Sequence, residues 1–405
     1  MGRLKLLFDA TELSYYLEES GHRAGVFFVA LNLFREFKKR EDIELTFYCD
    51  FKRYYFLKDI IAKVEEFKGL ELLKENSIVN LFFAKMNYSI KTKNNSNKFG
   101  MMYLSRLYEN LFHHKNKKNL TELKMFDAYF SPFTAPSDEI LASNLKRFRM
   151  IHDIIPILEK GKIPTNKSLW CYRIYNTINK NDFYLTNSEC TRRDILNYFN
   201  LEEANIKTTL LGVDESFRPT EAPKTEKYVF SLCTLGKRKN LIFAIKNFFK
   251  FIEKNKIKDL KLVLAGGIWD RFKNELAKAI GNFDQSKIEV LGYVKDEELP
   301  KLYSNAMMFV YPSLYEGFGL PVLEAMKCGC PVITSNCSSL PEVIGDAGIQ
   351  IDPNDDEALI NAYEKMYYDK FYRELSIERG LIRAKNFSWE KCADSIINFI
   401  KSKSS

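Results

Sequence analysis

Two glutamates separated by seven residues form the most promising chemical pattern in the chain, which reads EGFGLPVLE from Glu316 to Glu324. The two glycines between them allow a tight turn and let a ligand approach the backbone closely. Pro321 suits the first turn of a helix, and Gly329 suits its C-terminal cap. We therefore expect a helix at residues 320–328, whose free N–H groups and positive dipole end would favour an anionic phosphate.

The two glutamates would have different tasks beside such a turn. Glu324 lies about one turn into the expected helix, within reach of the ribose hydroxyls of a nucleotide. Glu316 comes just before the turn and can point at a sugar. By itself, the spacing also fits a helix start that carries two ordinary surface glutamates.

Short apolar runs alternate with helical stretches along the chain and would position these residues. The runs that read as buried strands are 4–10, 43–49, 128–131, 150–154, 183–186, 228–233, 261–265, 288–291, 307–311, 331–334 and 348–351. Repeated units of this kind imply parallel sheets with helices on both faces. The stretch 212–227 is rich in proline and charge and lacks periodicity, so it is the best candidate for a linker.

We therefore expect two α/β domains, at residues 1–211 and 228–388, on either side of this linker. Their parallel sheets would face a cleft between the carboxyl ends of the strands, where ligands bind in this architecture. An amphipathic helix is expected at the end of the chain, within residues 389–405.

The composition is that of a soluble globular enzyme. Of 405 residues, 46% are hydrophobic and 28% are charged, and no stretch approaches the ~18 apolar residues of a membrane-spanning helix. The N-terminal residues lack the pattern of a secretory signal. The eight cysteines contain no C-x-x-C pair. We therefore expect a cytoplasmic protein with reduced cysteines.

Most of the net charge of +8 lies in residues 85–124, which contain nine basic and two acidic residues. Apolar side chains are interspersed among these charges, so the segment can bind an anionic membrane surface. A solvated loop and helix is one alternative. A nucleic-acid-binding segment is another, although we expect no nucleic acid partner.

The E-x7-E stretch and its surroundings resemble the retaining glycosyltransferases of family 4, which have the GT-B fold of two Rossmann-like domains. The shared features extend over Leu291-Gly292-Tyr293-Val294, Tyr311-Pro312-Ser313, Pro331-Val332-Ile333, Leu340-Pro341-Glu342-Val343 and Gly345-Asp346-Ala347-Gly348. The N-terminal half resembles the family more weakly. The resemblance implies an acceptor-side first domain, a second domain that binds a nucleotide sugar, and a last helix that crosses back to the first domain.

A basic pair, Arg238 and Lys239, lies in the sequence LGKRKNL. It matches the pair that family members place against the donor diphosphate. Breaking the nucleotide-sugar bond develops negative charge on the leaving diphosphate, which fixed cations stabilise. The alternative is a basic helix start on the surface. The family generally has glycine at the position of Cys233, so the path of this loop can differ.

His152 and Asp153, in the sequence MIHDIIP, stand at the end of an expected strand. They resemble the His-Asp pair of mannosyl- and rhamnosyl-type members, in which the histidine borders the transferred sugar and can hydrogen-bond it or steady positive charge near the anomeric carbon. A histidine satisfied within the core is the alternative. The resemblance thus assigns His152, Asp153 and Glu316 to catalysis.

Several further positions match donor and acceptor loops of the family. Gly25 matches the glycine of the N-terminal loop, although the family's second glycine near residues 27–28 is absent. Ser188 matches a cleft position. The complete set expected to bind the donor is Arg238, Lys239, Glu324, Gly317, Phe318, Gly319, Leu320, Gly292, Tyr293, Gly266, Gly25 and Ser188.

The resemblance therefore implies a retaining hexosyltransferase, cytoplasmic or peripheral on the inner membrane face. Its donor would be a nucleotide sugar and its acceptor a hydroxyl of a glycan or lipid-linked glycan. The His-Asp-Ile-Ile-Pro context favours GDP-mannose, ahead of dTDP-rhamnose, UDP-glucose and UDP-N-acetylglucosamine. No Asp-x-Asp pair stands out, so we expect neither a metal nor another cofactor. An isomerase of the same fold and a non-catalytic partner in glycan assembly are the alternatives.

Overall fold

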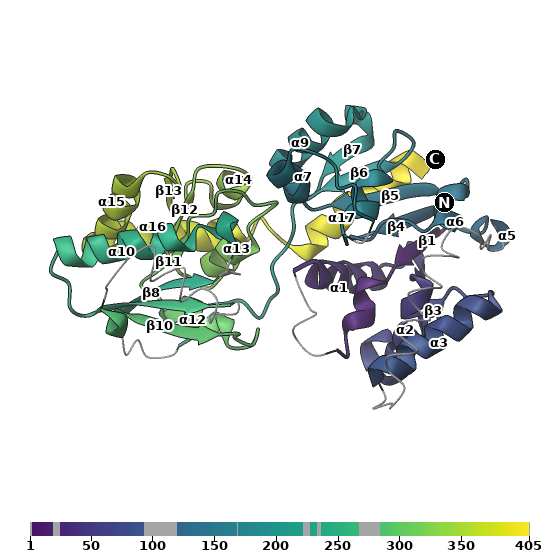
Figure 1. The fold of residues 1–405 in the computed structure, drawn as a ribbon, viewed down its shortest axis with the longest axis horizontal. Helices are drawn as coiled ribbons and strands as arrows, with labels where there is room; N and C mark the ends of the chain where they lie inside the picture. The colour runs from purple at the N-terminus through teal and green to yellow at the C-terminus, as the bar shows by residue number, and fades with distance from the viewer. Residues whose placement is uncertain are drawn as a thin grey trace. The chain divides into compact units, whose positions relative to one another are not determined.

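The computed structural model describes residues 2–18, 25–92, 120–167, 169–221, 227–232, 236–266 and 284–404. The chain divides into two compact units (Figure 1). The first comprises Met1–Thr186, Asp194–Thr209 and Glu390–Ser405, and the second comprises Asn187–Arg193 and Leu210–Trp389. This division differs from the expected domains because residues 187–193 belong to the second unit and residues 390–405 to the first. Part of the expected linker, 222–226, lies outside the described residues.

A seven-stranded parallel sheet forms the centre of the first unit, with the strand order β3-β2-β1-β4-β5-β6-β7. The strands are β1 Leu4–Asp9, β2 Ile43–Tyr48, β3 Glu71–Leu72, β4 Ala128–Ser131, β5 Lys146–Ile151, β6 Phe183–Thr186 and β7 Ile206–Thr208. The order reverses between β1 and β4. In sheets of this kind, ligands bind beyond the carboxyl ends of the strands at such a reversal.

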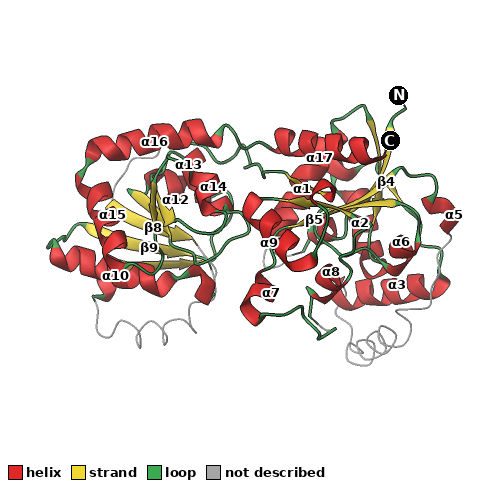
Figure 2. Ribbon diagram, turned by 90° about the horizontal axis from the view of Figure 1, so that it is seen from above, coloured by secondary structure: helices red, strands yellow, loops and turns green. Residues whose placement is uncertain are grey.

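Helices lie on both faces of this sheet (Figure 2). They are α1 Gly25–Lys38, α2 Tyr54–Lys63, α3 Ile78–Thr92, α5 Leu120–Leu123, α6 Asp138–Ala142, α7 Ile155–Lys160, α8 Tyr172–Asn176, α9 Glu189–Phe199 and α17 Trp389–Ser404. Residues that alternate along the strands pack against opposite layers. The ring of Phe8 contacts Phe37 of α1, whereas Leu7 belongs to a cluster with Ile140 of α6.

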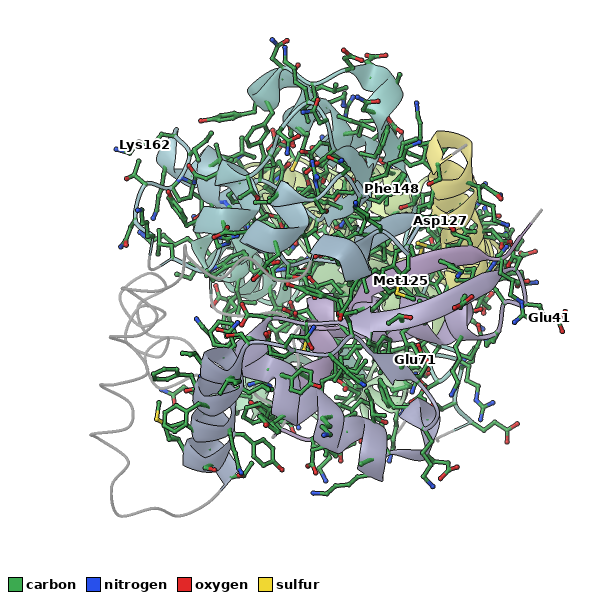
Figure 3. All side chains as sticks on the ribbon, turned by 90° about the vertical axis from the view of Figure 1, so that its right-hand side faces the viewer. Glu41, Glu71, Met125, Asp127, Phe148 and Lys162 are labelled. Atoms are coloured by element: carbon green, nitrogen blue, oxygen red, sulfur yellow. The ribbon has the colours of Figure 1, made fainter. Side chains whose placement is uncertain are left out.

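The last helix packs into the core of the first unit. The ring of Phe399 on α17 lies edge-on to Phe148 of β5 and Phe183 of β6, with centroid distances of 5.9 and 6.1 Å. Figure 3 shows Phe148 in the interior of this unit, while Glu41 and Lys162 project outward. The sequence therefore returns to the first unit at its end.

A six-stranded parallel sheet forms the second unit, with the order β10-β9-β8-β11-β12-β13. Its strands are β8 Lys227–Leu232, β9 Leu260–Ala265, β10 Ile288–Gly292, β11 Met308–Tyr311, β12 Val332–Ser335 and β13 Ile349–Ile351. The order reverses between β8 and β11. The helices are α10 Leu241–Lys254, α12 Leu299–Asn305, α13 Leu320–Lys327, α14 Leu340–Ile344, α15 Asp356–Tyr368 and α16 Lys370–Ala384. Helix α10 packs with α15 and α13 packs with α16, on opposite faces of the sheet (Figure 2).

Helix α13 begins and ends at the glycines that the sequence indicated. Gly319, which precedes it, has a φ of +118°, and a Cβ there would lie 2.8 Å from Leu340 Cδ2. At the other end, the N–H groups of Gly329 and Cys330 donate to the carbonyls of Met326 and Ala325 over 3.0 and 2.9 Å. This pair of bonds is a Schellman cap, and Gly329 has the positive φ, +69°, that the cap requires.

The strands expected from the sequence are all present, so the two parallel sheets are confirmed. The expected strand at 150–154 was misplaced, because β5 starts at Lys146 and ends at Ile151. The reason is that the charged residues at the start of β5 mask its strand character. Short strands β3 and β7 were not anticipated. Among the described residues, no helix has the length and apolar character needed to cross a bilayer.

Candidate active site

The residues with the strongest chemical pattern follow the two strands at which the second sheet reverses its order. Arg238 and Lys239 come shortly after β8, and Glu316 comes shortly after its neighbour β11. Because the carboxyl ends of parallel strands meet at one edge of a sheet, residues far apart in sequence are brought together here.

Both cations form ion pairs with the first glutamate of the motif. Lys239 Nζ lies 2.7 Å from Glu316 Oε1, and Arg238 Nη1 lies 2.8 Å from Glu316 Oε2. Lys239 also donates to the hydroxyl of Tyr311, and Arg238 donates to the carbonyl of Tyr315. These contacts hold all three charged groups in one cluster, which we call the cation–Glu316 cluster.

The charges in this cluster decide the protonation of Glu316. Burial alone would raise the pKa of the Glu316 carboxyl, but Lys239 and Arg238 outweigh burial and hold the pKa below its usual range. Glu316 is therefore a carboxylate at neutral pH. An anion that enters the cluster can bind the same two cations and take over part of the charge neutralisation that Glu316 provides.

In the turn that begins at Glu316, serine hydroxyls bind the backbone carbonyl oxygens, whereas the backbone N–H groups that follow Glu316 are left without an acceptor among the described residues. Ser339 Oγ lies 2.9 and 2.7 Å from the carbonyl oxygens of Glu316 and Phe318, and the hydroxyl of Ser188 donates to the carbonyl of Gly317 over 2.7 Å. Among the described residues, none accepts from the N–H groups at positions 317–320. These four donors, in the turn before α13 and on its first residue, suit a phosphate group.

The second glutamate of the motif lies in a different environment. The hydroxyl of Tyr303 on α12 donates to Glu324 Oε2 over 2.9 Å, and no other described residue bonds to this carboxyl group. Burial raises the pKa of Glu324 to about 7. Glu324 Oε1 is therefore available to a ribose hydroxyl, as the sequence predicted, although nothing in the structure tests that role.

His152 directly follows β5 in the first unit and is half-buried. Its Nε2 lies 2.7 Å from the carbonyl oxygen of Pro132. Because a carbonyl can only accept, the hydrogen of the ring lies on Nε2. Burial lowers the pKa of His152 to about 4, so the imidazole is neutral at pH 7. Its ring also contacts Phe133, with centroids 5.9 Å apart, and Phe133 stacks on the exposed Trp170.

The turn that follows His152 is fixed from both sides. Asp153 accepts from the N–H group of Ile155, the first residue of α7, over 2.9 Å, so its side chain closes an Asx turn just before this helix. The carbonyl of Asp153 accepts from the hydroxyl of Tyr175 on α8 over 3.2 Å. Asp153 thus has a structural task here, while its catalytic assignment stays a prediction.

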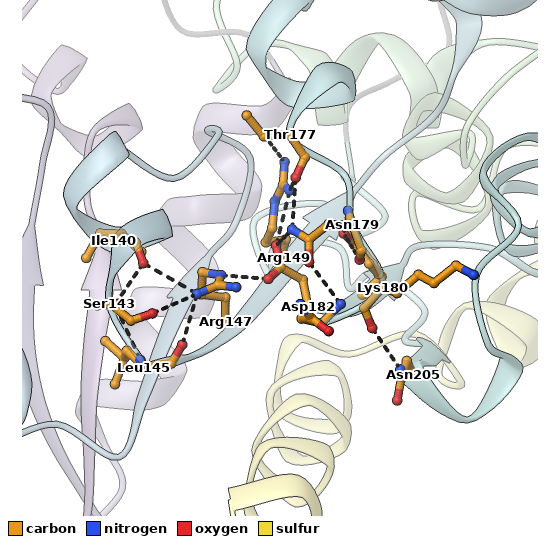
Figure 4. A network of polar contacts seen from close by, with 12 residues as sticks. Ile140, Ser143, Leu145, Arg147, Arg149, Thr177, Asn179, Lys180, Asp182 and Asn205 are labelled. Carbon is orange, nitrogen blue, oxygen red and sulfur yellow. Dashed lines mark hydrogen bonds and ion pairs between the residues drawn. The ribbon is translucent and has the colours of Figure 1, made fainter. Parts of the chain in front are cut away.

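A buried polar network supports α8 (Figure 4). Arg149 of β5, fully buried, donates to the carbonyls of Ile174 and Thr177 over 2.8 and 2.9 Å. Asp182 offsets its charge at 3.4 Å and also pairs with Arg147 at 2.6 Å. Because α8 carries Tyr175, this network fixes the turn next to His152 as well.

Comparisons with known proteins identify this architecture. Residues 212–381 match the family model of glycosyl transferases group 1. The second unit is a group 1 glycosyltransferase domain. The motif on which the sequence resemblance rested lies inside the matched residues, so the resemblance is confirmed.

The curated relatives of this glycosyltransferase domain include several mannosyltransferases. The chain is 37% identical to the O-antigen chain mannosyltransferase B of Escherichia coli over 241 residues, which cover 56% of this chain and 62% of that protein. It is 26% identical over 217 residues to the O-antigen chain mannosyltransferase RfbU of Salmonella typhimurium, covering 53% and 59%. The chain therefore spans less than two thirds of the length of these relatives.

Solved structures that match nearly the whole chain share its fold. A glycosyltransferase of Rickettsia africae is 16% identical with a TM-score of 0.64, and the match covers 99% of both chains. The Anabaena protein Alr3699/HepE, solved in complex with UDP and glucose, is 14% identical with a TM-score of 0.65, covering 99% of this chain and all of that one. These likenesses confirm the α/β GT-B fold class.

The other residues predicted to bind the donor lie in loops, in packed positions or at the starts of helices. Gly266 directly follows β9 and donates its N–H to the carbonyl of Gly292, at the end of β10, over 2.6 Å. Tyr293 is exposed beside them, while Phe318 is buried against Phe387. Leu320 begins α13, and Gly25 begins α1 in the first unit.

Sequence reasoning missed the residues that support the glycosyltransferase motif rather than form it. Ser339 holds the glycine turn, Tyr311 binds Lys239, and Tyr303 binds Glu324. A polar residue of the first unit was missed as well: Asp9, buried at the end of β1, accepts from the hydroxyls of Tyr129 and Thr134 over 2.5 and 2.6 Å. A carboxylate at the end of an apolar strand was the available signal for Asp9.

Proposed function

We propose that this protein is a retaining hexosyltransferase. It transfers a hexose from a nucleotide sugar to a hydroxyl of a glycan or a lipid-linked glycan. GDP-mannose is the donor we propose first. The mannosyltransferase names of the curated relatives support the sugar, and the His-Asp sequence at 152–153 supports the same choice.

The observation that carries this proposal is the cation–Glu316 cluster beside four N–H groups that bond to none of the described residues. Two cations and a helix start meet where the sheet order reverses, inside a group 1 glycosyltransferase domain. A diphosphate needs this combination, because its charge grows as the bond to the sugar breaks. Lys239 and Arg238 would bind the departing diphosphate, and the N–H groups of the turn would bind its oxygens.

The remaining roles follow from the positions of the carboxyl groups. Glu324 would hold the ribose through the oxygen that Tyr303 does not bind. Glu316 would face the transferred sugar once the diphosphate shares its cations. No carboxylate is assigned as a covalent nucleophile, so we propose that the sugar leaves and the acceptor enters on one face. The leaving phosphate would then take the proton of the acceptor hydroxyl.

We propose that the neutral His152 contacts the transferred sugar. A neutral imidazole can hydrogen-bond a sugar hydroxyl without adding positive charge near the anomeric carbon, where positive charge develops. The low pKa of His152, about 4, supports this role because the ring stays neutral throughout the physiological range.

A donor panel tests the proposal. Thermal unfolding of the protein should be measured with GDP-mannose, dTDP-rhamnose, UDP-glucose and UDP-N-acetylglucosamine, since a ligand at 100 times its Kd adds ~2.7 kcal/mol of stability. The stabilising donor is then supplied with a glycan acceptor, and the anomeric configuration of the product is read by NMR. Inversion would overturn the retaining mechanism. Stabilisation by none of these donors would overturn the proposed donor class.

A further inference from the structure

The first turn of α9 is bound to the glycine turn of the E-x7-E motif, and both segments belong to the second unit. Ser188 donates to the carbonyl of Gly317 over 2.7 Å. The same Ser188 oxygen accepts from the N–H group of Thr191 over 3.1 Å, so it caps α9 while it holds the turn. Thr191 Oγ1 lies 3.3 Å from the same carbonyl.

A carboxylate fixes this turn of α9 in place. Glu342 accepts from the N–H groups of Glu189 and Cys190 over 2.8 and 2.7 Å, one with each oxygen. A negative charge at a helix N-terminus is favourable because it meets unpaired N–H groups and the positive end of the dipole. Glu342 lies on α14, and this helix directly follows Ser338 and Ser339, the two serines that bind the backbone of Glu316.

The helix that carries Glu342 is itself secured. Arg383 of α16 donates to the carbonyls of Glu342 and Val343 over 2.7 and 3.1 Å. Ser188 and Thr191 are fully buried, so water does not compete for these bonds. The result is a continuous set of contacts from α16 through α14 and the start of α9 to Gly317.

We propose that Ser188 and Glu342 are positioning residues for the diphosphate of the donor. They hold the carbonyl of Gly317 against α9, and this fixes the peptide plane that carries the N–H group of Phe318, which has no acceptor among the described residues. This inference rests on the proposed function, and it changes the expected role of Ser188 from contacting the donor to orienting the backbone that contacts it.

The binding of GDP and of guanosine separates this role from a merely structural one. Guanosine lacks the phosphates, so only GDP binding should depend on the orientation of the turn. We expect Ser188→Ala and Glu342→Gln each to weaken GDP by about fivefold, the effect of one hydrogen bond, and to leave guanosine within about twofold of the parent. Titration calorimetry measures GDP, and ligand-observed NMR measures guanosine.

Two variants serve as matched controls. Ser188→Thr keeps the hydroxyl and should retain the GDP affinity of the parent. Glu378→Gln removes an exposed carboxylate of the same unit and should change nothing. If Glu342→Gln does not fold, the GDP affinities of Ser188→Ala and Ser188→Thr still test the positioning role.

The outcomes separate the two proposals. Unchanged GDP affinity in Ser188→Ala, or an equal loss for GDP and guanosine, overturns the positioning role alone. A parent protein that binds none of GDP, UDP, dTDP and pyrophosphate overturns the proposed function and this inference with it.

Discussion

Lys239 Nζ lies 2.7 Å from Glu316 Oε1, and this ion pair joins the loops that follow β8 and β11. Removing one partner of a buried pair leaves the other charge without compensation, which costs more than the pair contributes. The two residues are thus coupled before any ligand binds, and a substitution at either position changes the environment of the other.

We predict that Lys239→Ala lowers kcat/KM at least about tenfold, because it removes a cation from a site of developing charge. Arg238→Ala should also lower kcat/KM, but by less, since Arg238 is more exposed than Lys239. Steady-state kinetics with the donor identified by the panel measures both. Lys237→Ala is the matched control, because Lys237 is an exposed neighbour in the same loop. Near-normal turnover in both variants would place the diphosphate elsewhere.

The two glutamates should affect different kinetic constants. Glu316→Gln should mainly lower kcat, because its contact with the sugar changes as the bond breaks, and it should preserve nucleotide diphosphate affinity since both cations remain. Glu324→Gln should mainly raise the donor KM, because a ribose contact is equal in the ground and transition states. Kinetics beside titration with GDP separates the two. The opposite pattern would reverse the assignments.

The pKa of Glu324 gives a prediction for stability. It is raised from the usual 4.5 to about 7 by burial, so the folded state binds more protons between these pH values. The stability that the neutral carboxyl contributes is complete below pH ~4.5 and is lost as the pH rises through ~7. The side chain of Glu324→Gln stays neutral. As the pH rises from 4.5 to 8, the free energy of unfolding of this variant should therefore increase relative to that of the parent by about 1–3 kcal/mol.

Urea unfolding at several pH values checks this prediction. Glu297→Gln, an exposed glutamate in the same unit, should follow the parent at every pH. A constant difference between Glu324→Gln and the parent across the range would mean that Glu324 titrates normally.

Activity should survive the removal of divalent cations. The two cations and the N–H groups of the turn are proposed to stabilise the leaving diphosphate, and no acidic pair is assigned to a metal. The measurement is turnover after dialysis against EDTA, with and without added magnesium or manganese. Loss of activity that either metal restores would contradict the metal-independent mechanism.

The sequence predicted the parts of the molecule that depend on local patterns. The start and end of α13 followed from Pro321 and Gly329, and most of the strands followed from short apolar runs, although β3 and β7 did not. The ion pairs of Glu316 could not be derived, because they depend on the sheet order that places β8 beside β11. The bond from Ser188 to Gly317 crosses 129 residues, and no local pattern encodes it.

The basic segment at 85–124 gives the last prediction, which concerns an anionic membrane surface. Residues 93–119 lie outside the described part of the chain, but α3 precedes them and carries the strongly exposed Ile78 and Phe82 beside Lys85. Apolar side chains next to basic ones are typical of surfaces that bind anionic lipid. Binding to acidic liposomes should therefore fall with added salt, because surface charges are screened over ~10 Å at 0.1 M.

Replacing Lys115, Lys117 and Lys118 by glutamine should weaken liposome binding without changing turnover on a soluble acceptor. The same change at the exposed Lys207, Lys256 and Lys258 removes equal charge and should leave binding intact. Equal losses in the two triple variants would show that net charge acts, and not this segment.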